Sequence, residues 1–302
     1  MSMLLGTGTR IRLRLPGAGR ILPERTAILL TNPRSGSTWL LDLLRAHPRI
    51  GMERRATVFR ALRMEGRRYP RDLSGGEDAV RRIEVRPGRW EAVPVFAAGG
   101  GERGVRDLPP CGIEKCHPHF FDHRVERFVE DLALLQRATR VRMVYQVREP
   151  RTSIVSFLRY QERDPSWNAE RGPVQVAAHM RRIYESLLSL ARRLPGAVVD
   201  YGGLKRDLAG TVGGLLESIW ERDDPGFLEG QQGVLEGMAA ATRREERAAG
   251  GGSFLGASES RVDEETEALF RRCTSDLAAA DEAYRRLLDL PGRIGAGRRE
   301  GT

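Results

Sequence analysis

Lysine is almost absent from this chain. Of its 50 basic residues only two, Lys115 and Lys205, are lysines, and the rest are arginines. Together with abundant glycine and alanine, this bias is typical of a GC-rich bacterial genome rather than of a basic tract selected for binding. The arginines also alternate with acidic residues, as in residues 243–247, instead of forming blocks. The net charge of +9 therefore gives little support to a nucleic-acid partner.

Long apolar runs and paired cysteines are missing as well. No apolar stretch reaches the length of about 18 residues that spans a membrane, and no N-terminal run is long enough for a signal peptide. We therefore expect a cytoplasmic protein without a membrane anchor. The three cysteines, an odd number in 302 residues, predict thiols in a reducing compartment. A hydrophobic content of 40% is enough for one sizeable α/β core.

The most informative segment is residues 31–41, with the sequence TNPRSGSTWLL. It follows an apolar run at residues 27–30 and leads into an apolar helical pattern, so it predicts a strand, a tight turn and a helix start in that order. The free amide groups and the dipole of a helix N-terminus favour an anion. The segment supplies one flexible residue, three hydroxyl donors and a cation: Gly36, Ser35, Ser37, Thr38 and Arg34. This combination predicts a phosphate site.

The segment differs from the phosphate loop of a nucleoside-triphosphatase. That loop reads G-x-x-x-x-G-K-S/T, with its lysine on the phosphates and its hydroxyl on Mg²⁺. Here the first glycine is absent, Ser37 follows Gly36 where lysine is required, and the cation comes before the turn at Arg34. A degenerate P-loop kinase or NTPase stays open as an alternative, and it would need ATP and Mg²⁺.

A second segment points to another anion. Residues 141–149, VRMVYQVRE, are typical of a buried strand, and Pro150 ends the strand and opens a helix. Arg148 stands at the strand end and Ser156 about two turns into the helix, so both side chains can reach one anion. Taken alone, the segment also fits an ordinary strand-to-helix turn.

Together, the two segments resemble those of sulfotransferases that use 3′-phosphoadenosine 5′-phosphosulfate (PAPS). PRSGST followed by WLL and then His47-Pro48 is similar to the 5′-phosphosulfate loop of carbohydrate-type and related bacterial enzymes. The pattern strand-R-x-P-(x)₅-S-helix is similar to their 3′-phosphate segment. The resemblance implies that residues 34–38 hold the 5′-phosphate and that Arg148 and Ser156 hold the 3′-phosphate. It also implies PAPS as donor, adenosine 3′,5′-bisphosphate (PAP) as product and no required metal.

Two aromatic residues fit the resemblance more loosely. Trp39 is where the family places an aromatic ring that stacks on adenine, although core packing explains a helical tryptophan equally well. Tyr201 lies in a segment similar to the family's strand ending in Y-E-D-L and would contact the adenine. Glycines replace the acidic pair there. The family's C-terminal Arg/Gly loop has no clear counterpart, although residues 243–244 and 250–252 lie near the expected place.

Catalytic candidates come from two places. Lys115 and His117 resemble an E-K-x-P pattern whose lysine approaches the sulfuryl group and a K-x-H pattern whose histidine is the base. A histidine, with an ordinary pKa of about 6.5, accepts protons near neutral pH. Glu53, after His47-Pro48, is the rival base, because carbohydrate- and tyrosine-directed enzymes place a catalytic glutamate in this region. Both bases remain open, and Arg34 and Lys115 would stabilise the leaving charge.

Cysteine and histidine also cluster in this part of the chain, at Cys111, Cys116, His117, His119 and His123. Structural zinc sites usually bring two cysteine pairs, or a cysteine pair and a histidine pair, at short spacing. The other cysteine, Cys273, is far away in sequence, so we expect no metal site.

We expect a P-loop-like, three-layer α/β fold with a mainly parallel central sheet flanked by helices and with ligands at the carboxyl ends of the strands. Residues 25–290 are interpreted as one sulfotransferase-like domain. A basic lead-in at 1–24 that could add an edge strand precedes it, and a disordered tail at 291–302 follows. Residues 60–111 are interpreted as a variable insertion on the acceptor side. Apolar stripes predict helices over 122–138, 176–194 and 269–287.

The predicted activity is in-line transfer of a sulfuryl group from PAPS to a hydroxyl, less readily to an amine, of a carbohydrate, lipid or secondary metabolite. Apart from a kinase, the alternative is a non-catalytic protein, either a nucleotide-binding scaffold or a basic nucleic-acid-associated module. Neither the acceptor nor the oligomeric state follows from the sequence.

Overall fold

The computed structural model describes these residues: 2–5, 9–12, 25–45, 47, 50–53, 80–86, 89–94, 97–98, 111–121, 123–136, 140–163, 173–220 and 264–294. The chain divides into two compact units. The first unit contains residues 1–29, 44–116 and 126–142, and the second contains residues 30–43, 117–125 and 143–302. Most of the sequence motifs that predict anion binding fall in the second unit.

The main sheet is mostly parallel. Its hydrogen-bonded strand order is β11 (Arg293–Ile294), β10 (Ala197–Asp200), β9 (Arg140–Val147), β3 (Arg25–Thr31), β8 (Cys111–Cys116), β4 (Ile50–Glu53) and β7 (Ala97–Ala98). The pairs β10–β11, β9–β10 and β4–β8 are parallel, and the short β7 is antiparallel to β4. β3 is buried along its whole length, as its apolar run predicts. The predicted α/β class with a mainly parallel sheet is confirmed.

The first unit also holds two small antiparallel pairs. β1 (Ser2–Leu5) pairs with β2 (Thr9–Arg12) in a separate two-stranded sheet, so the described part of the lead-in adds no edge strand to the main sheet. β5 (Val80–Arg86) pairs with β6 (Arg89–Pro94). These two strands and β7 lie within the expected insertion at 60–111, and most of the remaining insertion lies outside the described residues. The helix predicted over 122–138 is α3 (Val125–Gln136).

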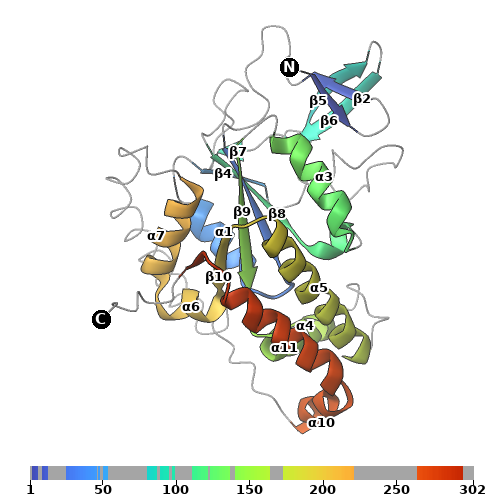
Figure 1. The fold of residues 1–302 in the computed structure, drawn as a ribbon, viewed down its shortest axis with the longest axis vertical. Helices are drawn as coiled ribbons and strands as arrows, with labels where there is room; N and C mark the ends of the chain where they lie inside the picture. The colour runs from blue at the N-terminus through green and yellow to red at the C-terminus, as the bar shows by residue number, and fades with distance from the viewer. Residues whose placement is uncertain are drawn as a thin grey trace. The chain divides into compact units, whose positions relative to one another are not determined.

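Helices flank the parallel strands of the second unit. Figure 1 shows α1 (Ser37–Arg45), α6 (Tyr201–Arg206) and α7 (Leu208–Ile219) to one side of β9 and β10. On the other side lie α4 (Pro150–Arg163), α5 (Pro173–Arg193) and α11 (Thr274–Leu288), which pack on one another. The predicted apolar stripe of α5 is buried at Val176, Met180, Ile183, Leu187 and Leu190.

The helix predicted over 269–287 is two helices. α10 (Glu264–Arg272) ends at Cys273, and α11 begins at Thr274. The Thr274 hydroxyl donates to the Arg271 carbonyl at 2.9 Å, and the Cys273 amide closes a tight turn on the Phe270 carbonyl at 3.2 Å. These bonds occupy carbonyls that would otherwise continue the α-helical ladder, so the helix breaks there.

The tail predicted to be disordered, residues 291–302, contains a strand at its start, so its predicted beginning is wrong. After α11 the chain returns to the sheet as β11, which pairs with β10 through Val198↔Arg293. Gly292 makes this return possible with a φ of +101°, and its carbonyl accepts from the Val198 amide at 3.0 Å. Residues 295–302 lie outside the described part.

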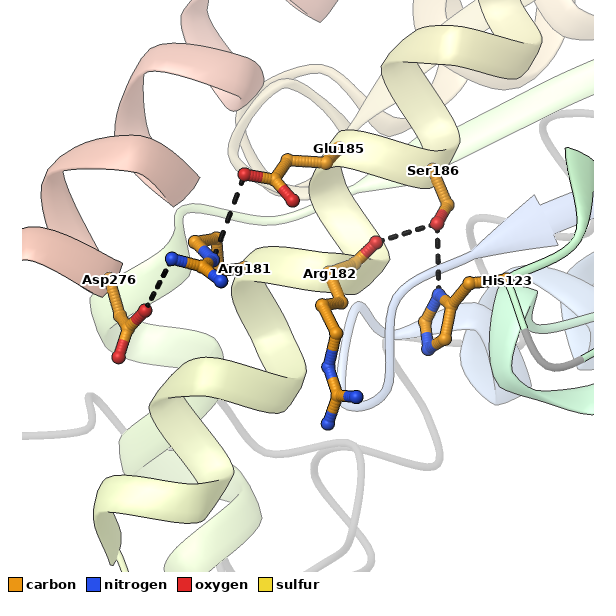
Figure 2. A network of polar contacts seen from close by, with 6 residues as sticks. All are labelled: His123, Arg181, Arg182, Glu185, Ser186 and Asp276. Carbon is orange, nitrogen blue, oxygen red and sulfur yellow. Dashed lines mark hydrogen bonds and ion pairs between the residues drawn. The ribbon is translucent and has the colours of Figure 1, made fainter.

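The middle of α5 is fixed to the segment after β8 and to α11, as Figure 2 shows. His123 Nδ1 donates to Ser186 Oγ at 2.9 Å, and this hydroxyl donates in turn to the Arg182 carbonyl at 2.7 Å. On another side of the helix, Arg181 pairs with Asp276 of α11 at 3.0 Å. Polar contacts therefore join α5 to two other segments of the second unit.

The helices and the cysteines of the described residues bear on a membrane span and on thiol reactivity. Within the described residues, no helix combines the length and the apolar character needed to cross a membrane. All three cysteines are buried, and burial raises the pKa of the Cys111 thiol to about 12 even though Arg25 acts in the opposite direction. Cys111 therefore stays a protonated, unreactive thiol at physiological pH.

Candidate functional site

The strand, turn and helix predicted over residues 31–41 are present in the second unit. β3 ends at Thr31 and α1 begins at Ser37, and the turn between them has two residues in the left-handed region, Arg34 (φ +64°) and Gly36 (φ +78°). The left-handed conformation costs roughly 1–2 kcal/mol at a non-glycine residue. The first amides of α1 have no partner within the helix, as at any helix start.

Hydrogen bonds within the turn occupy three of its carbonyls. The Thr31 hydroxyl donates to the Asn32 carbonyl at 2.9 Å and also contacts the Ser35 hydroxyl. The Asn32 side-chain amide donates to the Pro33 carbonyl at 2.9 Å. The Gly36 carbonyl accepts from the Leu40 amide at 3.0 Å, which is the first hydrogen bond of α1. The turn is thus internally fixed.

Side chains from elsewhere in the second unit occupy the other three carbonyls. His117 Nδ1 lies 2.7 Å from the Thr31 carbonyl oxygen, Arg148 Nη1 donates to the Arg34 carbonyl at 3.2 Å, and Gln146 Nε2 donates to the Ser35 carbonyl at 3.0 Å. Every carbonyl from residue 31 to residue 36 therefore has a protein donor. Because carbonyl oxygens repel anions, this arrangement leaves the turn to present amides and hydroxyls, which is what an anion requires.

Asn32 joins the turn to β9 and α4. Its Nδ2 donates to Ser153 Oγ at 3.0 Å, and its Oδ1 accepts from the Arg148 amide at 3.2 Å. The sequence interpretation missed Asn32, Gln146 and Ser153. Gln146 carries a signal in the sequence, because it is a polar residue next to the apolar residues of a predicted buried strand. The structure buries it fully, and a buried polar group needs a partner.

Arg34 lies against α4. Its Nε donates to Ser156 Oγ at 3.2 Å, and its guanidinium lies 4.9 Å from the centre of the Tyr160 ring. The sequence interpretation assigned Arg34 and Ser156 to different phosphates, and the structure brings the two side chains together. Thr38, also assigned to the loop, is exposed in the first turn of α1, whereas Ser37 is buried.

Arg148 and Tyr201 meet at the carboxyl ends of neighbouring strands. β9 and β10 pair in register with Val147 opposite Asp200, so the two residues that follow lie side by side. The Arg148 guanidinium stands 4.7 Å from the centre of the Tyr201 ring, and its Nε donates to Thr152 Oγ1 at 3.1 Å. Burial lowers the pKa of Arg148, so a neighbouring anion would compensate a cation that water solvates poorly.

Tyr201 also closes on the turn. A Cβ added to Gly36 would lie 2.4 Å from Tyr201 Cε2, so only glycine fits there. Trp39 stands edge to face with the same ring, with centroids 6.2 Å apart and an interplanar angle of 78°. Trp39 Nε1 is buried and has no hydrogen-bond partner among the described residues. The indole donor is thus a buried polar group that the described protein atoms leave unsatisfied.

The contact to Thr31 fixes the tautomer of His117. A carbonyl oxygen only accepts, so Nδ1 carries the hydrogen, and the lone pair of the neutral ring lies on Nε2. His119 stacks on His117 at 5.2 Å, and His179 lies 5.7 Å from His119. No group of three or more histidine, cysteine or acidic residues in the described part of the chain is arranged to hold a metal ion.

The remaining candidates belong to the first unit. Lys115 is half-buried in β8, and Glu53 ends β4 in register with Glu114 of β8. The side chain of Glu53 lies outside the described ones, as do Arg243, Arg244 and residues 250–252. The second unit contains the other candidates: Arg34, Ser35, Gly36, Ser37, Thr38, Trp39, His117, Arg148, Ser156 and Tyr201.

This chain is similar to a protein domain of known structure. The sulfotransferase domain of the olefin synthase from Synechococcus PCC 7002 matches with a TM-score of 0.44 and 16% sequence identity, over 89% of this chain and 96% of that domain. No protein-family model matches the sequence. No curated protein matches it either.

Proposed function

We propose that this protein is a sulfotransferase that transfers a sulfuryl group from PAPS to the hydroxyl of a small-molecule or glycan acceptor. The observation that carries the proposal is the turn at residues 31–36, whose carbonyls are all occupied by protein donors. Arg34 and Arg148 lie at this turn, so it combines amides, hydroxyls and two cations in one place. These groups suit a ligand with more than one phosphate.

The roles follow from these contacts. The amides of residues 36–38 and the hydroxyls of Ser37 and Thr38 hold the 5′-phosphate at the start of α1, while Arg148 and the Arg34–Ser156 pair hold the 3′-phosphate. Trp39 and Tyr201 hold the adenine, and the buried Trp39 Nε1 offers it a donor. A sulfuryl group carries less negative charge than a phosphoryl group, so side-chain cations suffice without Mg²⁺.

The chemical step is an in-line displacement at sulfur. The acceptor oxygen forms a new S–O bond as the S–O bond to the 5′-phosphate breaks, and PAP leaves with the electron pair. His117 Nε2 takes the proton of the acceptor hydroxyl, because its Nδ1 is already committed to the Thr31 carbonyl. A cation near the bridging oxygen stabilises the charge that develops on the leaving phosphate.

Thermal unfolding with nucleotides tests the donor site. PAP without metal, at about 100 times its Kd, is expected to stabilise the protein by about 2.7 kcal/mol, which raises Tm by several degrees. The matched arm contains ATP and Mg²⁺. A rise in Tm with Mg-ATP alone would indicate a kinase or NTPase. No rise in Tm with either ligand would indicate a scaffold without a nucleotide site.

Replacing either arginine is expected to weaken binding selectively. Arg148→Ala and Arg34→Ala should each raise the Kd for PAP roughly ten- to hundredfold, since each removes charge-assisted hydrogen bonds, and should abolish most transfer activity. Titration calorimetry measures the Kd. Arg285→Ala is the matched control, because this exposed arginine of α11 pairs with Glu282 at the surface. Near-wild-type binding by both Arg34→Ala and Arg148→Ala would contradict the site assignment.

A further inference from the structure

Two tyrosines outside the nucleotide site contact the backbone and the helix cap that position it. Tyr184 of α5 is fully buried, and its hydroxyl donates to the carbonyl of Arg148. The same hydroxyl lies 3.5 Å from Ser153 Oγ, the hydroxyl that accepts from Asn32. Tyr184 therefore fixes the backbone at the point where the chain leaves β9 and turns into α4.

Tyr284 of α11 does the same at the end of β10. Its hydroxyl donates to Asp200 Oδ1 at 2.8 Å. The other carboxylate oxygen, Oδ2, accepts from the Gly203 amide at 2.9 Å and caps α6, whose first residue is Tyr201. With both oxygens occupied, the Asp200 side chain has one orientation, and the start of α6 is held with it.

The two tyrosines also contact each other. Their rings meet edge to face, with centroids 6.3 Å apart and an interplanar angle of 85°. Burial raises the pKa of both phenols, so each stays a protonated donor throughout the physiological range. A continuous chain of contacts thus runs from Arg148 through Tyr184 and Tyr284 to Asp200 and Tyr201.

We propose that Tyr184 and Tyr284 are positioning residues of the nucleotide site, which keep Arg148 and Tyr201 at the separation that binds the nucleotide. The inference rests on the proposed function and extends it to the C-terminal helix. β9 and β10 pair as far as Val147 and Asp200, so the strand register brings the two next residues side by side but no hydrogen bond of the ladder holds them. The tyrosine pair supplies that constraint from α5 and α11.

The first readout is the preference of the protein for the 3′-phosphate. It is the Kd for adenosine 5′-monophosphate divided by the Kd for PAP, measured by titration calorimetry. Tyr184→Phe keeps the ring and removes the bond to Arg148, so it is expected to lower this ratio roughly three- to tenfold. In an Arg148→Ala background the same change should have no further effect on the ratio, because Tyr184 acts through Arg148.

Tyr284→Phe is expected to raise the Kd values for both nucleotides by the same factor, roughly three- to tenfold, because it loosens the helix cap beside Tyr201. This loss should disappear in a Tyr201→Ala background. Tyr145→Phe is the matched control. It also removes a buried phenol-to-carbonyl hydrogen bond in the second unit, from Tyr145 to Leu194 at 2.7 Å, at the end of α5. It should lower Tm without changing either Kd.

Three outcomes separate the claims. A wild-type protein that prefers PAP, a Tyr184→Phe variant with a lower ratio and a Tyr145→Phe variant with the wild-type ratio support the inference. A wild-type preference that Tyr184→Phe retains, together with wild-type Kd values for both nucleotides in Tyr284→Phe, overturns the positioning role and leaves the proposed function standing. A wild-type protein without a preference for PAP overturns the proposed function together with the inference.

Discussion

Replacing Gly36 by alanine is expected to abolish PAP binding while leaving the protein folded. The φ of +78° costs a non-glycine residue roughly 1–2 kcal/mol, and the new Cβ would lie 2.4 Å from the Tyr201 ring. The ring cannot retreat without disturbing its contact with Arg148. The added methyl group thus strains the turn, displaces the Tyr201 ring and disturbs Arg148. The Kd for PAP should therefore rise roughly a hundredfold or more.

Gly203→Ala provides a control with the same chemical change. Gly203 is buried in α6, close to Tyr201, but a Cβ there would come no nearer than 3.9 Å to the Asp200 side chain. Alanine also has the higher helix propensity, so this variant should fold and bind as the wild type does. The pair is compared by calorimetry with PAP and by thermal unfolding. Wild-type affinity in Gly36→Ala would show that neither the turn nor Tyr201 forms the nucleotide site.

The sequence predicted the local elements of the site because their signals are short-range. An apolar run before Asn32 and glycine at position 36 define a strand and a turn within a few residues, and proline at position 150 marks a helix start directly after its own strand. The resulting elements, β3, α1, β9 and α4, agree with those predictions. The roles of their side chains in binding stay predictions.

The side-chain contacts were not predictable, because they depend on strand order and on backbone geometry. The contact of Arg34 with Ser156 joins a left-handed turn to a helix more than 100 residues away. Tyr184 and Tyr284 lie on helical faces whose pattern predicts only core packing, and the hydroxyl of each reaches a polar group beyond that core. β11 was missed because a two-residue strand after a glycine has no periodicity to detect.

His117→Asn is expected to remove catalysis while preserving the nucleotide site. The side-chain nitrogen of asparagine takes the place of His117 Nδ1 and can still donate to the Thr31 carbonyl, but asparagine has nothing at the Nε2 position to accept a proton. The kcat should therefore fall by roughly 10² to 10⁴, the usual contribution of a general base. The assay follows PAP release from PAPS with a panel of phenols, alcohols and sugars, and calorimetry checks that PAP binding is unchanged.

The pH dependence of the wild type separates the two candidate bases. With a histidine base, kcat/KM should fall as the pH drops below about 6.5, whereas a glutamate base would sustain activity to about pH 4.3. Protonation removes the free base in both cases, so the acidic limb reports its pKa. If His117→Asn turned over at the wild-type rate, His117 would not be the base, and Glu53→Gln should then show the loss. If His117→Asn and Glu53→Gln both kept wild-type activity, neither residue would be the general base, which would contradict the proposed mechanism.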